Sequence, residues 1–391
     1  MTPNPAIGVL YHWLGGLASG SFYVPYRGVK GWAWETFWLA GGFFSWIIAP
    51  WVLAGLLTKD LFAVLREAPA GSLFWACFFG LLWGVGGLTF GLTMRYLGLS
   101  LGMAMVLGLC AAFGTLMPPI FSGEFMSHVA GTSSGRIILL GIFVCLAGIA
   151  VAGLAGISKE RAMSTAEKRA VIKEFDLKKG TGVAILSGVM SACFAYGLAA
   201  GDPIKSLTLQ HGTPVLWQGL PVLIVVLVGG FTTNFIWCLW LNFRNHTGHQ
   251  YFSATSAPIA HGSVALETAI DAPSREVVEH MPSAALAKSA AERAPMLRNY
   301  LLCALAGTTW YFQFFFYTMG ETQMGQYKFS SWTLHMASII IFSTLWGLGL
   351  KEWKGAGAPA MRWLTLALVL LVGSTVIVGY GNYLGISHPV R

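Results

Sequence analysis

Charged side chains are scarce in this sequence. Asp, Glu, Lys and Arg make up 10% of the residues, whereas hydrophobic residues make up 55% and the mean hydropathy is +0.64. Water-soluble globular proteins carry roughly 25% charged residues, so this chain has too little charge to cover a soluble fold of its size. The composition instead indicates a protein embedded in a lipid bilayer.

The sequence also lacks the usual marks of catalysis, metal binding and ATP-driven transport. Its six cysteines each lie inside an apolar run without metal-ligand spacing, so we interpret them as small core residues. It contains no GxxxxGK[ST] phosphate loop and no catalytic triad. We therefore expect no enzyme, no catalytic residue, no metal site and no cofactor. The N-terminus has no basic stretch before its first apolar run, so we expect that run to be retained as a span.

Long apolar runs dominate what is present. Each is about as long as the roughly 20 residues that a helix needs to cross the hydrocarbon, and none alternates as a membrane β-barrel strand does. We expect an all-α polytopic membrane protein with ten transmembrane helices. The runs cover approximately residues 6–24, 36–57, 72–93, 97–121, 136–157, 180–201, 215–243, 297–319, 330–350 and 362–386.

Basic residues are concentrated on one side of this expected topology. Most Lys and Arg residues lie in the loops that follow odd-numbered spans, above all in 158–179 and 244–296. Because such loops stay in the cytoplasm, we predict a bacterial inner-membrane protein with both termini in the periplasm. The net charge of +8 is accordingly a topology signal, and we expect no nucleic-acid partner.

Residues 245–296 differ in composition from the rest of the chain. They are rich in Ala, Ser, Thr, Glu and His and contain four prolines. We expect a cytoplasmic linker with at most one short helix near 283–293. The predicted organisation is a first five-helix repeat at 1–157, a basic connector at 158–179, and a second five-helix repeat at 180–391 that the linker interrupts.

The two five-helix units share a sparse sequence signature. The segment from Gly16 to Phe22 aligns with the segment from Gly188 to Phe194, and Thr115 aligns with Thr344. The second offset in residue number is larger than the first because the linker lies between the matching positions. Since each unit has an odd number of spans, the second repeat must be inverted relative to the first. Inverted repeats with a site between them near the midplane are typical of secondary transporters.

Six short motifs are spread along the chain. They are Trp34-Glu35-Thr36, Gly91-Leu-Thr-Met-Arg95-Tyr96-Leu-Gly98, Gly114-Thr115-Leu-Met-x-Pro119-Ile, Gln313-Phe-Phe-Phe-Tyr317, Ser331-Trp332-x-Leu-His335-Met336 and Leu350-Lys351-Glu352-Trp353. Together they resemble the L-rhamnose–proton symporter family of the drug/metabolite transporter superfamily. The resemblance implies import of L-rhamnose, or a close deoxy sugar, by proton symport with alternating access. The alternative is the same fold carrying another sugar or small metabolite, as an importer or an exporter.

Proton coupling needs a titratable group inside the membrane, where ionisable residues are costly and therefore rare. Glu35 opens the second span among tryptophans and is the first candidate; the alternative is an acid that stabilises a helix N-terminus. His335 in the ninth span and His12 in the first are the other candidates. For each histidine, the alternative is a structural role. We interpret Asp202 and Glu321 as interfacial charges.

Sugar recognition combines aromatic rings with a few fixed polar groups in a mostly apolar pocket. Gln313 and Tyr317 are four residues apart and so share a helix face. Aromatic residues at span ends also form interfacial belts, which is the alternative for Tyr23. We expect a sugar, protons and the lipid bilayer as partners. The candidate substrate-binding residues are His12, Trp13, Tyr23, Gln218, Gln313, Tyr317, Tyr327, Trp332 and His335.

Overall fold

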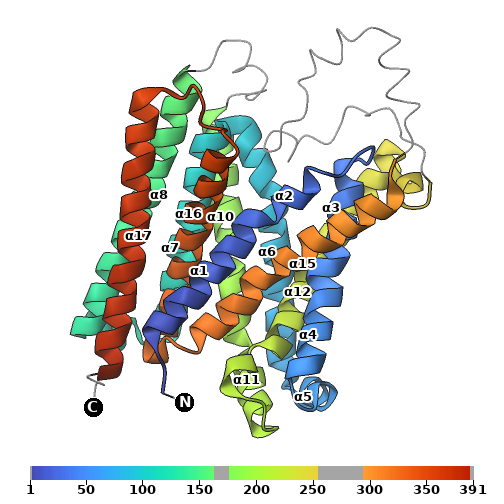
Figure 1. The fold of residues 1–391 in the computed structure, drawn as a ribbon. Coiled ribbons are helices and arrows are strands. Elements are labelled where there is room, and N and C mark those ends of the chain that lie inside the picture. The colour runs from blue at the N-terminus through green and yellow to red at the C-terminus, as the bar shows by residue number, and fades with distance from the viewer. Residues whose placement is uncertain (1, 163–175, 254–293, 388–391) are drawn as a thin grey trace, which may run out of the picture.

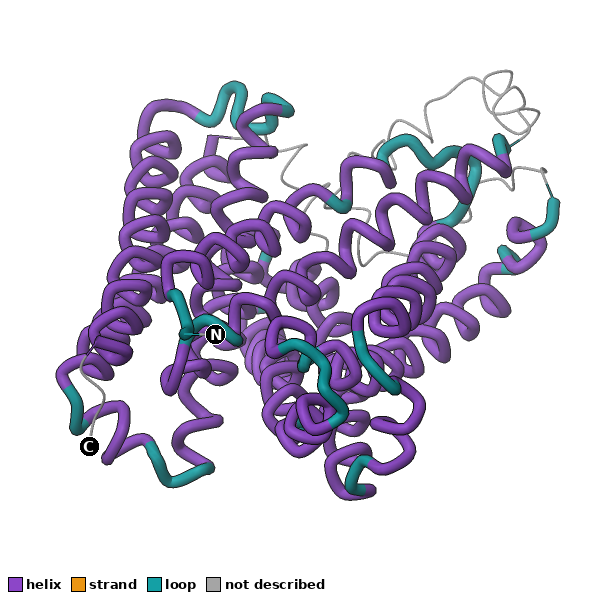
Figure 2. Tube along the Cα trace, turned by 60° about the horizontal axis from the view of Figure 1, so that its bottom comes forward, coloured by secondary structure: helices purple, strands orange, loops and turns teal. Residues whose placement is uncertain are grey.

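The computed structural model describes residues 2–162, 176–253 and 294–387, which form helices and turns without a strand. Helices lie on all ten apolar runs (Figure 1; Figure 2). The long helices are α1 (Pro5–Ser21), α3 (Trp34–Gly42) continued by the π-helical η1 (Phe43–Ile48) and α4 (Ala49–Leu57), α6 (Ala70–Leu97), α7 (Leu99–Phe121), α8 (Ser133–Ala162), α10 (Leu177–Ala200), α12 (Leu220–Asn245), α15 (Met296–Glu321), α16 (Ser331–Gly349) and α17 (Gly357–Ser387). The short ones are α2 (Tyr23–Tyr26), α5 (Leu61–Glu67), η2 (Phe125–Ala130), α11 (Asp202–Gln210), η3 (Val215–Trp217), η4 (Gly248–Tyr251) and η5 (Gly325–Ser330).

Eight helical segments among the described residues are long and apolar enough to cross a membrane. The two long helices outside this set are α1 and α15. α1 has only 17 residues, and α15 carries the polar residues Thr308, Thr309, Gln313 and Tyr317 within its apolar sequence. These two helices contribute His12, Gln313, Tyr317 and Glu321 to the groups described below.

Polar caps fix where α1 and α10 begin. The Oδ1 atom of Asn4 accepts a hydrogen bond from the Ala6 N–H at 3.1 Å, and Pro5 opens α1 with its constrained φ. Asp176 caps α10 by accepting from the Lys179 N–H at 3.0 Å, and this bond lowers the pKa of the Asp176 carboxyl below its usual value. The two helices run in opposite directions through the molecule (Figure 1).

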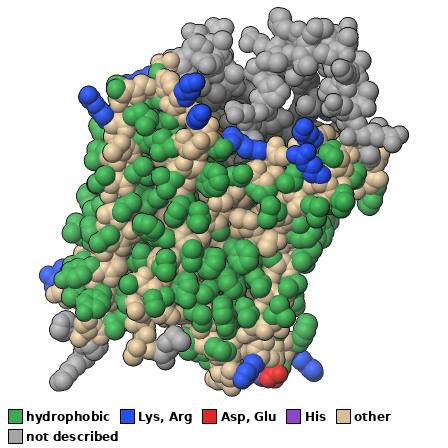
Figure 3. All heavy atoms as spheres, in the orientation of Figure 1, with side chains coloured by type: hydrophobic (Ala, Val, Ile, Leu, Met, Phe, Trp, Pro, Cys, Tyr) green, Lys and Arg blue, Asp and Glu red, His purple; other side chains and the backbone are tan. Residues whose placement is uncertain are grey.

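The molecule has two distinct ends. Both termini lie at one end together with α5 and α11, and we call it the terminus end (Figure 1). α8 and α12 finish, and α10 and α15 begin, at the opposite end, which we call the linker end. Figure 3 shows apolar side chains along the sides, with Lys and Arg gathered mainly near the linker end.

The beginning of the expected linker is part of the folded body. η4 at Gly248–Tyr251 lies against the start of α3, where the side chain of Gln250 accepts a hydrogen bond from the Ala33 N–H at 2.7 Å. Residues 248–251 of the expected linker are therefore helical and packed against α3. The short helix expected near 283–293 lies outside the described residues.

Close helix packing holds α1 against α15 and α16. α8 packs along α17, α6 lies against α10 and α12, and α1 lies against α15 and α16. Gly16 of α1 lies so close to Ser338 of α16 that a Cβ atom would overlap it. Gly80 of α6 lies equally close to the carbonyl of Val226 in α12. Small residues allow such backbone approach between membrane helices.

Candidate functional site

Two buried histidines and a tyrosine meet where α1, α15 and α16 come together. The ring of Tyr317 lies 5.3 Å from that of His12 and 5.3 Å from that of His335, both in edge-on geometry. Both histidines have no exposed surface. None of their ring nitrogens has a hydrogen-bond partner among the described residues. We call His12, Tyr317 and His335 the histidine cluster.

Glycines make room for the two imidazoles. A Cβ atom at Gly320 of α15 would lie 2.7 Å from Nε2 of His12, and one at Gly15 of α1 would lie 2.8 Å from the carbonyl oxygen of Gln313. The hydroxyl of Ser338 donates to the carbonyl of His12 at 2.8 Å, which ties α16 to α1 beside the rings. The histidine positions thus depend on small residues in the adjoining helices.

Aromatic side chains form one wall of the histidine cluster. Trp332 lies 5.9 Å and Phe314 6.0 Å from the ring of His335, and Phe314 stacks on Phe194 of α10 at 4.0 Å. The indole N–H of Trp332 donates to the carbonyl of Cys110 at 3.0 Å, which fixes that ring against α7. Aromatic faces beside unpartnered imidazoles suit a ligand with both C–H and hydroxyl surfaces.

The structure brings together five of the nine residues considered for the sugar and places four elsewhere. His12, Tyr317, Trp332 and His335 lie in or beside the histidine cluster, and Gln313 lies one turn before Tyr317, with its Nε2 donating to the Trp310 carbonyl at 3.0 Å. The other four have different surroundings. The ring of Trp13 lies edge-on to that of Phe342, the ring of Tyr23 lies 4.0 Å from that of Phe22 in a tilted arrangement, and Gln218 follows η3. Tyr327 packs with Ile138 and Ile142, and its hydroxyl forms a hydrogen bond with that of Thr132.

Glu35 lies in a separate place, in the first turn of α3 at the linker end. It is fully buried. Its Oε1 accepts hydrogen bonds from the side chains of Asn245 at 3.0 Å and Thr247 at 2.8 Å, and its Oε2 has no partner among the described residues. Uncharged donors therefore tie this carboxyl group to the end of α12 and the start of η4.

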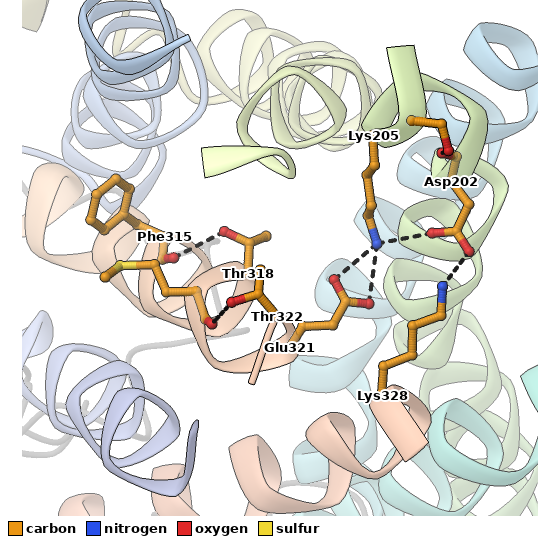
Figure 4. A network of polar contacts seen from close by, with 9 residues as sticks. Asp202, Lys205, Phe315, Thr318, Glu321, Thr322 and Lys328 are labelled. Carbon is orange, nitrogen blue, oxygen red and sulfur yellow. Dashed lines mark hydrogen bonds and ion pairs between the residues drawn. The ribbon is translucent and has the colours of Figure 1, made fainter. Parts of the chain in front are cut away.

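A network of ion pairs lies at the terminus end (Figure 4). Nζ of Lys205 lies 2.9 Å from a carboxylate oxygen of Glu321 and 3.1 Å from one of Asp202. The other oxygen of Asp202 accepts from Lys328 at 2.6 Å. Asp202 and Glu321 were expected to be interfacial charges, but the side chain of Glu321 is only 14% exposed and that of Lys205 only 8%.

A comparison with protein-family models matches residues 1–259 and 283–384 to the family described as L-rhamnose-proton symport protein. The chain belongs to this family. Individual proteins of the L-rhamnose-proton symport family are also similar to the chain. The L-rhamnose-proton symporter of Cronobacter sakazakii is 35% identical over 376 residues, which cover 96% of this chain and 97% of that protein. Those of Salmonella gallinarum and Salmonella newport are 34% identical over the same shares. No solved structure gives a significant match.

The burial of Lys205 in this L-rhamnose-proton symport family member was not foreseen from the sequence. Lys205 lies between two apolar runs, and the only local sign was its spacing of three residues from Asp202. Its partner Glu321 is 116 residues away in the chain. In the described part of the chain, no three His, Cys, Asp or Glu side chains are grouped so that they would hold a metal ion.

Proposed function

We propose that this chain imports L-rhamnose, or a close deoxy sugar, together with protons across a bacterial inner membrane. The family match over nearly the whole chain carries this proposal. The histidine cluster supports it, because imidazole and phenol groups bind hydroxyls and imidazole also carries protons. In this proposal the chain is a transporter and not an enzyme, and it uses no cofactor beyond the coupling proton.

The proposed topology has ten spans, with α1 and α15 added to the eight apolar segments. α15 has 26 residues and so reaches about 39 Å at 1.5 Å per residue, and α2 follows α1 in nearly the same direction (Figure 1). The gathering of Lys and Arg near the linker end supports a cytoplasmic linker end (Figure 3). Both termini then lie in the periplasm.

We further propose that the two halves are inverted repeats. Pairs of contacts between matching positions support this. Gly16 lies against Ser338. Gly188, the counterpart of Gly16, lies against Leu109, the counterpart of Ser338. Likewise, Gly80 lies against the carbonyl of Val226. Gly307, the counterpart of Gly80, lies against the carbonyl of Gly41, the counterpart of Val226. The matching helices are α1 with α10, α3 with α12, α6 with α15 and α7 with α16. One offset in residue number relates the matching positions of each helix pair.

Two ring pairs support a pseudo-twofold axis between these repeats. Trp83 and Trp310 differ by the same offset in residue number that relates Gly80 of α6 to Gly307 of α15, and their rings stack at 5.8 Å. Trp46 and Phe231 differ by the offset that relates Gly41 to Val226, and their rings lie 6.2 Å apart. A residue meets its own counterpart only beside such an axis. Rocking of one repeat against the other would give alternating access.

The histidine cluster is the proposed sugar site. His12, His335 and Tyr317 would bond sugar hydroxyls, with Gln313 beside them, and Trp332 would pack on the C–H surface and the methyl group of a deoxy sugar. Trp13, Tyr23, Gln218 and Tyr327 are left out of this proposal because their contacts lie elsewhere.

The same histidines are proposed to carry the proton through the centre of the protein. Glu35 is proposed to receive it at the linker end, because it combines complete burial with an oxygen that has no partner among the described residues. Ionisable groups at such depth in a membrane protein commonly serve proton relays.

Uptake into proteoliposomes tests the proposed function. Purified protein is reconstituted, and uptake of labelled L-rhamnose is measured with and without an acid-outside gradient. Accumulation above the external concentration is expected only with the gradient, and a protonophore should abolish it. Uptake that ignores the gradient would contradict proton symport. L-Fucose and D-mannose as competitors test which sugar is preferred.

A further inference from the structure

A buried ion pair lies one helical turn from the proposed sugar site. Glu321 follows Tyr317 by four residues on α15, and Gly320, next to Glu321, lies against the ring of His12. Its partner Lys205 comes from α11, the short helix that follows α10 at the terminus end (Figure 1; Figure 4). The Lys205–Glu321 pair therefore joins two helices of the second repeat directly below the site.

The surrounding charges allow this ion pair to break. An ammonium group that loses its only buried partner is strongly destabilised. Lys205 has a second partner, because Oδ1 of Asp202 lies 3.1 Å from its Nζ. Lys328 holds the other oxygen of Asp202 at 2.6 Å. Lys205 can thus give up Glu321 and remain paired.

We propose that Glu321 is the carboxylate through which a proton opens the terminus end. Adding a proton to Glu321 removes its negative charge, so the ion pair to Lys205 is lost while Lys205 stays with Asp202. α11 is then no longer held to α15 by charge. When the proton leaves Glu321 for the histidine cluster, the ion pair forms again and closes this end. The inference rests on the proposed function and adds the group that takes up the proton.

Other titratable groups surround Glu321. Lys205 pairs with Glu321 directly, Asp202 and Lys328 complete the network of ion pairs, and His12 lies beside the neighbouring glycine. Tyr317 lies one turn before it on the same helix.

The substitution Glu321→Gln tests the proposal in proteoliposomes. Glutamine keeps the shape but cannot exchange a proton. We expect the variant to lose gradient-driven accumulation of L-rhamnose completely, because glutamine cannot re-form the ion pair to Lys205 that closes the terminus end. The matched control is Glu352→Gln, which removes a half-exposed carboxylate that pairs with Arg27 at 3.0 Å. The control should accumulate L-rhamnose as the unaltered protein does.

Accumulation by Glu321→Gln at the level of the unaltered protein would overturn the role of Glu321 alone. Absence of gradient-driven accumulation in the unaltered protein would instead overturn the proposed function, and this inference with it. If thermal unfolding in detergent shows that Glu321→Gln does not fold, the double variant Lys205→Gln/Glu321→Gln replaces it. That variant leaves no single charge of the pair behind, and the same loss of accumulation is expected.

Discussion

In the proposed inverted repeats, the histidine cluster and its counterpart share a backbone arrangement but differ in the chemistry of their side chains. At the offsets of the proposed repeats, His12 corresponds to Ala184, Tyr317 to Phe90 and His335 to Val106. Leu97, Val106 and Ala184 form a buried apolar cluster against which Phe90 packs. The fold thus provides the same crossing of three helices twice, and polar side chains occupy only one of the crossings. In the proposed function, the transport chemistry therefore depends on the polar side chains of one crossing and not on the helix arrangement that both crossings share.

The largest effect is expected when the polar crossing is made to resemble the apolar one. His335→Val removes a hydrogen-bonding ring from the proposed sugar site, and the loss of one such partner costs about 1–3 kcal/mol, or roughly 5- to 150-fold in uptake efficiency. Initial rates of L-rhamnose uptake over a range of concentrations measure it. Val106→Ala is the matched control in the apolar crossing and should cost about 1 kcal/mol of stability with little change in uptake. Equal losses of uptake in both variants would remove the functional difference between the crossings.

A second contrast concerns the linker end. Glu35 of α3 corresponds to Leu220 of α12, at the same offset in residue number that relates Gly41 to Val226, and both are fully buried. Glu35→Gln keeps an oxygen that can accept from Asn245 and Thr247 but cannot bind a proton, so we expect sugar exchange to persist and accumulation to fall to equilibrium. Thr247→Val removes one donor and keeps the carboxyl group; it should cost about 1 kcal/mol of stability and leave accumulation in place. Undiminished accumulation by Glu35→Gln would exclude Glu35 from coupling.

The space around His12 is a further difference between the polar and the apolar helix crossing. At the proposed offset, Gly320 corresponds to Thr93. The large imidazole of His12 therefore has the small Gly320 as its neighbour, whereas the small Ala184 is matched with the larger Thr93. Gly320→Ala would place a Cβ atom 2.7 Å from Nε2 of His12, and such overpacking costs about 1–3 kcal/mol. We expect slower uptake and a lower unfolding temperature.

The control for this glycine is Gly87→Ala on α6. A Cβ atom there meets no atom within 4 Å, and alanine is favoured over glycine in a helix by about 0.5–1 kcal/mol. The unfolding temperature should therefore rise slightly and uptake should be unchanged. A loss of uptake in this variant would mean that helix flexibility, and not the fit around His12, limits transport.

The helices were predictable from the sequence, and the side-chain pairings were not. Apolar runs locate spans because burial in lipid acts on each residue locally. Tyr23 and Tyr327 were predicted to bind the sugar because they are aromatic. Residue type alone does not show which helix faces which neighbour, so their actual contacts could not be predicted. Lys205 and Glu321 pair across 116 residues, and no local pattern records such a contact. Two of the four proposed repeat offsets, those that relate Gly16 to Gly188 and Thr115 to Thr344, could be found in the sequence because matching residues keep their order in both halves.

The smallest expected effect concerns Trp332 in the aromatic wall of the histidine cluster. Trp332 and the matching residue of the other proposed repeat differ in how far their side chains are exposed. Trp332 is buried and its indole N–H donates to the carbonyl of Cys110, whereas its counterpart Met103 is exposed. Trp332→Phe keeps an aromatic face for the sugar but leaves that carbonyl without its donor, which costs about 1 kcal/mol. The unfolding temperature should fall modestly and the affinity for L-rhamnose should change little. The exposed Trp363 provides the control, since Trp363→Phe should alter neither quantity. A large loss of affinity in Trp332→Phe with an unchanged unfolding temperature would instead mean that the indole N–H turns to the sugar during transport.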